Sequence, residues 1–535
     1  MKDRIKSIPL LLLIIIFILP ACAPAIVQVL PNPTAYILVT APAAATPTPF
    51  QPGNNSLPTL TLPPPPTFTP IPPSATPIPP TATPIPPSPT AVMPTLPPVQ
   101  PSAIPTAIGI RPQYAITAML DYDAHTLTVS QDIYYPNNTG QTLSSLLLAV
   151  NPNLWSGVFA LQSLAVNDNP HNDYSLAGHA LTINLPNALG PGDTVKIGIS
   201  YLLNLPYASS KFENFGYSSR QTNLTDWFPF IVPYINGQWI LREPWAFGEN
   251  LVYDKADFHI ELGFASPDNI PVVAASAPAQ ATDAGLRYTL TDARTFSFSM
   301  SREFAVSAQT TASGVTVTSY YYPEDADAGN AVLARTAEAV ETYSRVIGPY
   351  THSALSVVET DLNDGLESDG LYFLARSFYR SYDGTATNNL TVIGIHETAH
   401  QWWFGSVASD QAEEPWLDEA LSCYTEHIYY ENNYPNLVNW WWNWRVNYYN
   451  PTGYIDTRIY NPPTFRAYVN AVYLNGANFF DALRIRIGDQ AFFNFLRDYY
   501  ASNTGRIANA NDFFAALARH ASGYDDITRA YFQNR

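Results

Sequence analysis

The distribution of proline is the feature that most restricts what this chain can fold into. Of its 49 prolines, 28 lie between Pro24 and Pro112, and no charged residue occurs from Ser7 to Ile110. Proline fixes φ and lacks the backbone N–H that helices and sheets use. Residues 23–111 are therefore predicted to form a disordered, Pro- and Thr-rich stalk that samples polyproline II and acts as a spacer.

The segment before the stalk has the parts of an export signal. Three basic side chains open it, a short apolar run follows, and a small residue directly precedes Cys22. The run is shorter than the ~20 apolar residues that span a bilayer, so residues 1–22 are interpreted as a signal peptide. A small residue before cysteine is typical of bacterial lipoproteins, so Cys22 is the predicted lipidation site and membrane anchor. The alternative is ordinary secretion, with cleavage close to this cysteine.

Charge and cysteine content exclude two classes of protein. The net charge is −18, and since the first six residues carry +2, the rest of the chain carries −20. Nucleic-acid binding needs a basic surface, so nucleic acid is not an expected partner. With Cys22 and Cys423 as the only cysteines, a disulfide framework is not expected either.

Two changes in residue pattern divide the remaining chain into two domains. Residues 112–307 contain period-two apolar runs separated by Gly, Pro and Asn, which predicts antiparallel strands. Further on, helical spacing covers 325–347, and the pattern is mainly helical after Asn388. The chain is thus expected to be multidomain, with an all-β domain at 112–307 and an α+β, mainly helical domain at 308–535.

The strongest chemical signal is a His-Glu-x-x-His motif at His396, Glu397 and His400, within an apolar stretch that lacks proline. Residues four apart share one face of a helix, so both imidazoles can bind one metal ion. Glu397 lies one position further along and is placed to act as a base on a water molecule.

A third ligand is predicted at Glu419, because catalytic zinc takes three protein ligands. Eighteen residues separate it from His400, and Pro415 indicates a helix start just before it. Together these residues predict one Zn²⁺ per chain, bound by His396, His400 and Glu419, with Glu397 as general base. The alternative is a buried histidine pair with an unrelated surface carboxylate.

This pattern resembles the gluzincin aminopeptidases of the aminopeptidase N family. Their His-Glu-x-x-His motif, eighteen-residue gap and Trp-Leu-Asn/Asp-Glu segment are matched here by His396–His400 and Trp416–Glu419. The resemblance extends from about Tyr114 to the end of the chain. It implies a saddle-shaped β-domain followed by a thermolysin-like zinc-peptidase domain, in a short form without the helical C-terminal domain of larger relatives.

The resemblance also implies three further roles. In place of the family's Gly-x-Met-Glu-x motif stands Gly365–Ser368, in which Glu367 would bind the free α-amine of the substrate; a candidate edge strand follows at 371–375. Tyr473 matches a tyrosine whose hydroxyl stabilises the oxyanion. Glu426 matches a carboxylate that could orient a zinc-bound histidine. The structural alternatives are a turn, a packed tyrosine and a solvated helix glutamate.

Taken together, these features predict an extracytoplasmic, membrane-anchored zinc metallopeptidase that acts on peptides with free N-termini. Two alternatives stay open. One is a zinc endopeptidase of the same fold, in which Glu367 is structural. The other is a non-catalytic surface-display or wall-binding protein whose metal site is vestigial.

Overall fold

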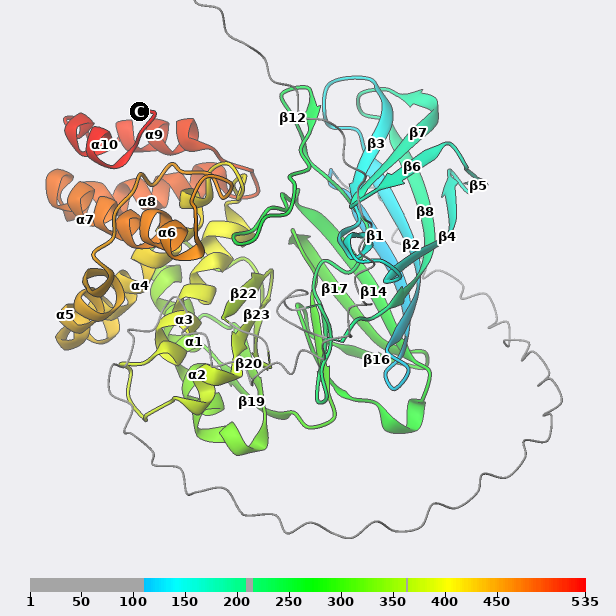
Figure 1. Ribbon diagram of the computed structural model, residues 1–535, viewed down its shortest axis with the longest axis horizontal. Helices are drawn as coiled ribbons and strands as arrows, with labels where there is room; N and C mark the ends of the chain where they lie inside the picture. Colours follow the sequence, from blue (N-terminus) through cyan, green and yellow to red (C-terminus); the bar gives the residue numbers. More distant parts are fainter. Residues whose placement is uncertain (1–109, 208–214, 362–363) are drawn as a thin grey trace, which may run out of the picture. The chain divides into compact units, whose positions relative to one another are not determined.

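The computed structural model describes residues 110–207, 215–361 and 364–535 (Figure 1). The predicted signal peptide, its Cys22 and nearly all of the predicted stalk lie outside these residues, so the expectations for them stay predictions. In the described part of the chain, no helix combines the length and the apolar character that a membrane span requires.

The N-terminal domain consists of β-strands, as the period-two pattern predicts. Among the described residues, its largest sheet has the strand order β16-β17-β14-β1-β2-β8-β4-β5. In this sheet β1 runs parallel to β14 and antiparallel to β2. Alternate residues of β2 and β8 are buried, so one face of each strand covers the core. The strands are β1 (Gln113–Asp121), β2 (Thr126–Pro136), β4 (Phe159–Val166), β5 (Asn169–Pro170), β8 (Thr194–Asn204), β14 (Ala256–Phe264), β16 (Gln280–Thr282) and β17 (Gly285–Ala293).

Smaller sheets complete this domain, with strand orders β15-β18-β10-β9 and β11-β3-β7-β6 and a β12-β13 ribbon. Their strands are β3 (Leu143–Ala149), β6 (Tyr174–Ala177), β7 (Ala180–Leu189), β9 (Gly216–Tyr217), β10 (Thr222–Leu224), β11 (Phe230–Ile231), β12 (Tyr234–Ile235), β13 (Gln238–Trp239), β15 (Val272–Ala275) and β18 (Phe298–Ser301). One hydrophobic core joins the sheets, and it includes the fully buried Trp227, Phe258 and Phe298.

The C-terminal domain begins with a sheet of order β19-β20-β21-β23-β22. Its strands are β19 (Ala305–Thr310), β20 (Thr316–Tyr321), β21 (Ala354–Thr360), β22 (Gly365–Ser368) and β23 (Leu371–Ala375). The sequence placed the edge strand at 371–375, and this was wrong. A tight turn at Asp369 and Gly370, where Gly370 has φ of 68°, folds residues 365–368 back as the edge strand itself.

Helices fill the rest of the C-terminal domain, as predicted. The helix α1 (Ala326–Val346) packs against β19 and β20, and α3 (Asn389–His400) packs against α1, β22 and β23. Most of the C-terminal helices lie beyond α3 in the chain (Figure 1). The remaining helices are α2 (Arg376–Arg380), α4 (Glu419–Asn433), α5 (Val438–Trp441), α6 (Phe465–Val469), α7 (Asn475–Ile487), α8 (Asp489–Asn503), α9 (Ala510–Ala518) and α10 (Asp525–Tyr531).

A buried arginine that follows β17 connects the β-domain to the C-terminal domain. The Arg294 guanidinium donates to the carbonyls of Phe404 and Gly405 at 3.0 and 3.1 Å, just beyond α3. Its backbone N–H donates to Asp369 at 2.6 Å, in the turn after β22. Since α3 and β22 carry most of the predicted site residues, these bonds hold together the two segments that frame the site.

Candidate metal centre and active site

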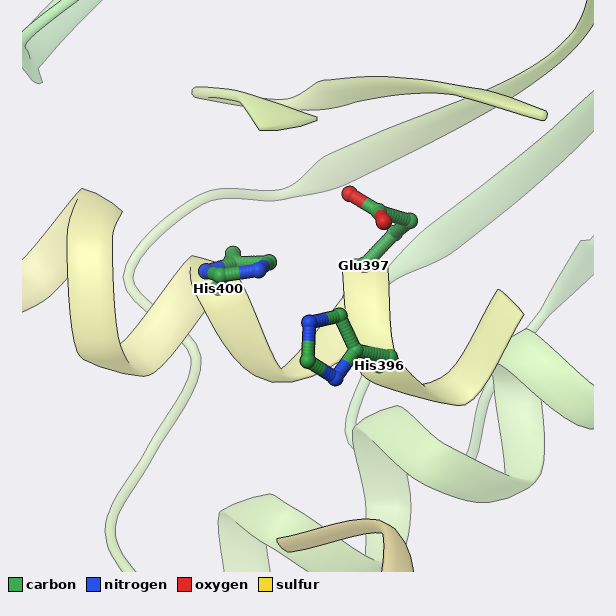
Figure 2. Close-up of side chains that lie close together, drawn as sticks. All are labelled: His396, Glu397 and His400. Carbon is green, nitrogen blue, oxygen red and sulfur yellow. The ribbon is translucent and has the colours of Figure 1, made fainter. Parts of the chain in front are cut away.

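The helix α3 brings the side chains of the motif together in a buried environment. It begins after Asn388, whose side-chain oxygen accepts from the N–H of Thr391 at 3.0 Å. Every residue of α3 is buried. The rings of His396 and His400 lie 4.8 Å apart, and Figure 2 shows both rings and the Glu397 carboxylate gathered on this helix.

Glu419 reaches the two histidines from the next helix. Pro415 opens a short 3₁₀ turn that leads into α4, so Glu419 is the first residue of that helix. Its Oε2 lies 3.2 Å from Nε2 of His396 and 3.5 Å from Nε2 of His400. Burial raises the pKa of Glu419, but the two histidines outweigh burial and lower it to about 2. An ionised carboxylate therefore faces both ring nitrogens.

The other ring nitrogen of each histidine has its own buried carboxylate partner. Nδ1 of His396 lies 2.8 Å from Oε1 of Glu426, and Nδ1 of His400 lies 2.6 Å from Oδ1 of Asp418. A carboxylate at Nδ1 holds the proton there and leaves Nε2 as the metal-binding atom. The sequence predicted this contact for Glu426 but missed Asp418, although Asp418 directly precedes Glu419.

Glu426 is itself fixed by two donors from the Trp-rich segment after α4. Arg445 donates to its two carboxylate oxygens at 2.8 and 3.0 Å, and the Trp441 indole N–H donates at 2.9 Å. All three side chains are fully buried. Burial raises the pKa of Glu426, but Arg445 and His396 outweigh burial and lower it. The carboxylate that holds His396 is therefore itself paired with a buried cation, Arg445.

Glu397 has the environment expected of a base that meets a water molecule. The residue is 5 % exposed, and its Oε2 has no hydrogen-bond partner among the described residues. Burial raises the pKa of this carboxyl well above its usual range. A Cβ built on Gly365 would collide with Oε1 of Glu397, so a glycine at this point of β22 leaves room for the carboxylate. A buried carboxylate oxygen without a protein partner is available to a molecule from outside.

Two tyrosines line the centre, Tyr468 from α6 and Tyr473 from the segment between α6 and α7. Tyr473 lies in the π-helical turn Asn470–Leu474, and its ring stacks on that of His396 at 5.8 Å. Its hydrogen bond to Glu419 helps to lower the pKa of that carboxyl, which burial raises. The ring of Tyr468 lies 5.7 Å from that of Tyr473. The Tyr468 hydroxyl is buried and has no partner among the described residues.

Two further carboxylates make one side of the centre acidic. Glu367, on the edge strand β22, accepts from Nε2 of Gln411 at 3.1 Å, and burial raises its pKa to about 7. Glu249 comes from the β-domain, in the segment before β14. Burial raises its pKa well above the usual range, and the negative charges of Glu419 and Glu367 raise it further. No sequence motif marks Glu249 or Gln411, so neither residue was predicted from the sequence.

The donor atoms of this centre fit a zinc ion. Two imidazole nitrogens and one carboxylate oxygen converge, which is the ligand set of catalytic zinc sites that keep one position open. Several buried carboxylates also gather at this point, and a bound cation compensates such a cluster. This donor set is typical of zinc metallopeptidases whose third ligand is a glutamate from a second helix.

Comparison of the sequence with protein families agrees with this class. Residues 334–531 match the model described as the Peptidase family M1 domain. The matched range lies within the C-terminal domain and includes α3, α4 and Tyr473. Among curated proteins, none matches the sequence.

Several solved structures share the fold. An M1 zinc metallopeptidase from Deinococcus radiodurans is 16% identical, with a TM-score of 0.58 over 79% of this chain and 95% of that chain. A mutant M1 zinc metallopeptidase from the same organism, bound to a Tyr-Ser-Ala substrate, has a TM-score of 0.57 at 16% identity over 80% and 95%. A two-domain M1 zinc metallopeptidase mutant bound to L-tryptophan has a TM-score of 0.57 at 16% identity, over 81% of this chain and 97% of that chain. The expected order of domains, β-rich and then helical, is thus confirmed.

Proposed function

We propose that this chain is a zinc-dependent aminopeptidase that removes N-terminal residues from peptides outside the cell, with one zinc ion per chain. The observation that carries the proposal is the pair of partly exposed carboxylates, Glu367 and Glu249, beside the metal centre. Burial and neighbouring negative charge raise the pKa of both groups. The ammonium group of a free N-terminus would neutralise them and pair with Glu367.

Each residue around the metal position has a separate role in the hydrolysis. Zinc held by His396, His400 and Glu419 would supply a Lewis acid. Glu397 accepts a proton from the attacking water and delivers it to the leaving amine nitrogen, so the base returns to its starting state. Tyr473 donates a hydrogen bond to the oxyanion that forms when the water adds to the carbonyl carbon.

The first prediction concerns the substrate's N-terminus. The zinc-loaded protein is expected to cleave a peptide with a free N-terminus about 100-fold faster, in kcat/KM, than its N-acetylated form, because acetylation removes the ion pair with Glu367. A chelator should abolish both activities. Assays of the paired peptides, with products identified by mass spectrometry, measure the ratio.

The variant Glu367→Gln should lower this ratio without releasing zinc, because it removes the charge but keeps the side chain's size. The matched control is Glu341→Gln on α1, where the carboxylate accepts from Ser313 at 2.7 Å. Cleavage of both peptides at similar rates by the unmodified protein would contradict the aminopeptidase and favour the endopeptidase.

The second prediction concerns the location of the protein. The leader pattern supports a lipid anchor at Cys22, so the full chain should collect in the membrane fraction, and Cys22→Ala should release it. Fractionation followed by immunoblotting measures the distribution. Cys423→Ala is the matched control, since Cys423 is a buried free thiol that has no role in anchoring. Equal distribution of all three proteins would contradict the anchor.

A further inference from the structure

Between β22 and α4, one glutamine amide connects the amine-binding carboxylate to the metal centre. We infer that Gln411 is a positioning residue that holds Glu367 at a set distance from His400, so that cleavage falls one residue from the N-terminus. This inference rests on the proposed aminopeptidase function. It adds a determinant of where the substrate is cut, from a residue that no motif marks.

The contacts of Gln411 form a continuous path between the two groups. Its Nε2 donates to Oε1 of Glu367 at 3.1 Å and to Oδ2 of Asp418 at 2.8 Å. The other oxygen of Asp418 lies 2.6 Å from Nδ1 of His400. Gln411 is 4 % exposed, and atoms of Glu367, His400 and Asp418 lie within 4.8 Å of one another. A single amide therefore separates the carboxylate at the substrate amine from the one that supports a metal-binding imidazole.

A neutral amide suits the position of Gln411 because it lies between two carboxylates, those of Glu367 and Asp418. Two carboxylates this close repel each other, and an NH₂ group offers one proton to each of them without adding charge. An arginine or lysine would also bridge them, but its positive charge would compete with the substrate's ammonium group. The neutral donor leaves the Glu367 carboxyl available to pair with the substrate's ammonium group.

The loop that carries Gln411 is anchored on its other side. The neighbouring Asp410 accepts from the Arg242 guanidinium of the β-domain at 2.6 Å. The strand that carries Glu367 is anchored as well. Gln401, next to His400, donates to the carbonyl of Ser368 at 2.9 Å and accepts from the N–H of Gly370 at 3.0 Å.

The bond from Gln411 sets the position of the Glu367 side chain. The backbone of β22 is held by Gln401, but a glutamate side chain on an edge strand has several rotamers, and selecting one costs conformational entropy. The bond from Gln411 selects one of them before substrate arrives. Without this bond, a peptide with a free N-terminus would lose much of its higher kcat/KM relative to a blocked peptide, while the metal centre would stay intact.

The test compares zinc-loaded Gln411→Met with the unmodified full chain, on a peptide with a free N-terminus and on its N-acetylated form. Methionine keeps the length of the side chain but removes both donors. We expect the ratio of kcat/KM for the free peptide to that for the blocked peptide to fall about 10- to 100-fold, the range for loss of a supporting hydrogen bond. The change should arise from a higher KM for the free peptide, and zinc affinity, measured by chelator competition, should stay within about threefold.

The control and a second variant separate this role from general damage. Gln131→Met removes an equally buried amide in β2, which donates to the carbonyl of Pro229 at 2.6 Å, and should leave the ratio unchanged. If Gln411→Met does not fold, Gln411→Asn provides the measurement, because its shorter side chain cannot reach both carboxylates.

Each outcome of this experiment has a defined meaning. If the unmodified protein prefers the free peptide and both Gln411 variants keep that preference, the positioning role is wrong while the aminopeptidase stands. An equal loss on both peptides, or a loss of zinc, also overturns the role, because the effect would then act through the fold or the metal. If the unmodified protein shows no preference, the proposed function falls and this inference falls with it.

Discussion

Replacement of Glu397 with glutamine is expected to lower peptide hydrolysis by about 10²- to 10⁴-fold, the usual contribution of a general base, while zinc stays bound. Glutamine has nearly the same shape but cannot accept the proton of the attacking water. The metal should remain because Glu397 is not one of the three expected ligands. Oε2 has no partner among the described residues that the variant would disturb, and Gly365 leaves room for the side chain, so the variant's side chain is expected to occupy the same place.

The measurement pairs kcat/KM with zinc content for Glu397→Gln and for Glu341→Gln as control. Full activity in the variant would remove Glu397 from the mechanism. Zinc loss together with activity loss would show instead that Glu397 supports the metal. Only lost activity with retained zinc assigns the base.

Loss of Glu419 is expected to affect metal binding most. Its Oε2 lies 3.2 and 3.5 Å from the two histidine nitrogens, so Glu419→Ala leaves two ligands where catalytic zinc takes three. Zinc affinity should fall by more than the roughly 100-fold seen when an outer partner of a ligand is lost. Peptidase activity at ordinary zinc concentrations should disappear with the metal.

Thermal unfolding measures this effect without relying on activity. Zinc at 1,000 times its Kd should stabilise the unmodified protein by about 4 kcal/mol, since it binds only the folded state. The same zinc concentration should leave the melting temperature of Glu419→Ala nearly unchanged. Glu431→Ala, further along α4 and paired with Arg484, is the matched control and should keep the zinc response. A full zinc response in Glu419→Ala would exclude this glutamate as a ligand.

The secondary structure could be predicted largely from local patterns. Period-two runs predicted β1, β2 and β8, and the spacing at 325–347 predicted α1, because burial of one face imposes a period on the sequence. The edge of the catalytic sheet was assigned to the wrong strand. A strand's neighbours depend on which segments pair through backbone hydrogen bonds, and the side-chain pattern of one strand does not record this.

The candidate site was predicted where its residues occur in one short pattern. His396, Glu397 and His400 lie within five positions on one helix, and Glu419 follows at a defined spacing. Glu249 and Gln411 carry no such pattern, since each reaches the centre from a loop that other elements hold in place. The pairing of Arg445 and Trp441 with Glu426 was equally invisible, because it joins two helices across the core.

The sequence by itself determined the order of the two domains and the residue types of the metal centre, since apolar periodicity and ligand spacing along a helix are local properties. The tertiary structure alone decided which side chains stand behind those ligands and which carboxylates share the site with them. Asp418, Gln411 and Glu249 come together only when α4, its preceding loop and the β-domain pack against one another. Their chemistry depends on the low-dielectric surroundings that this packing creates, where each remaining charge needs a partner.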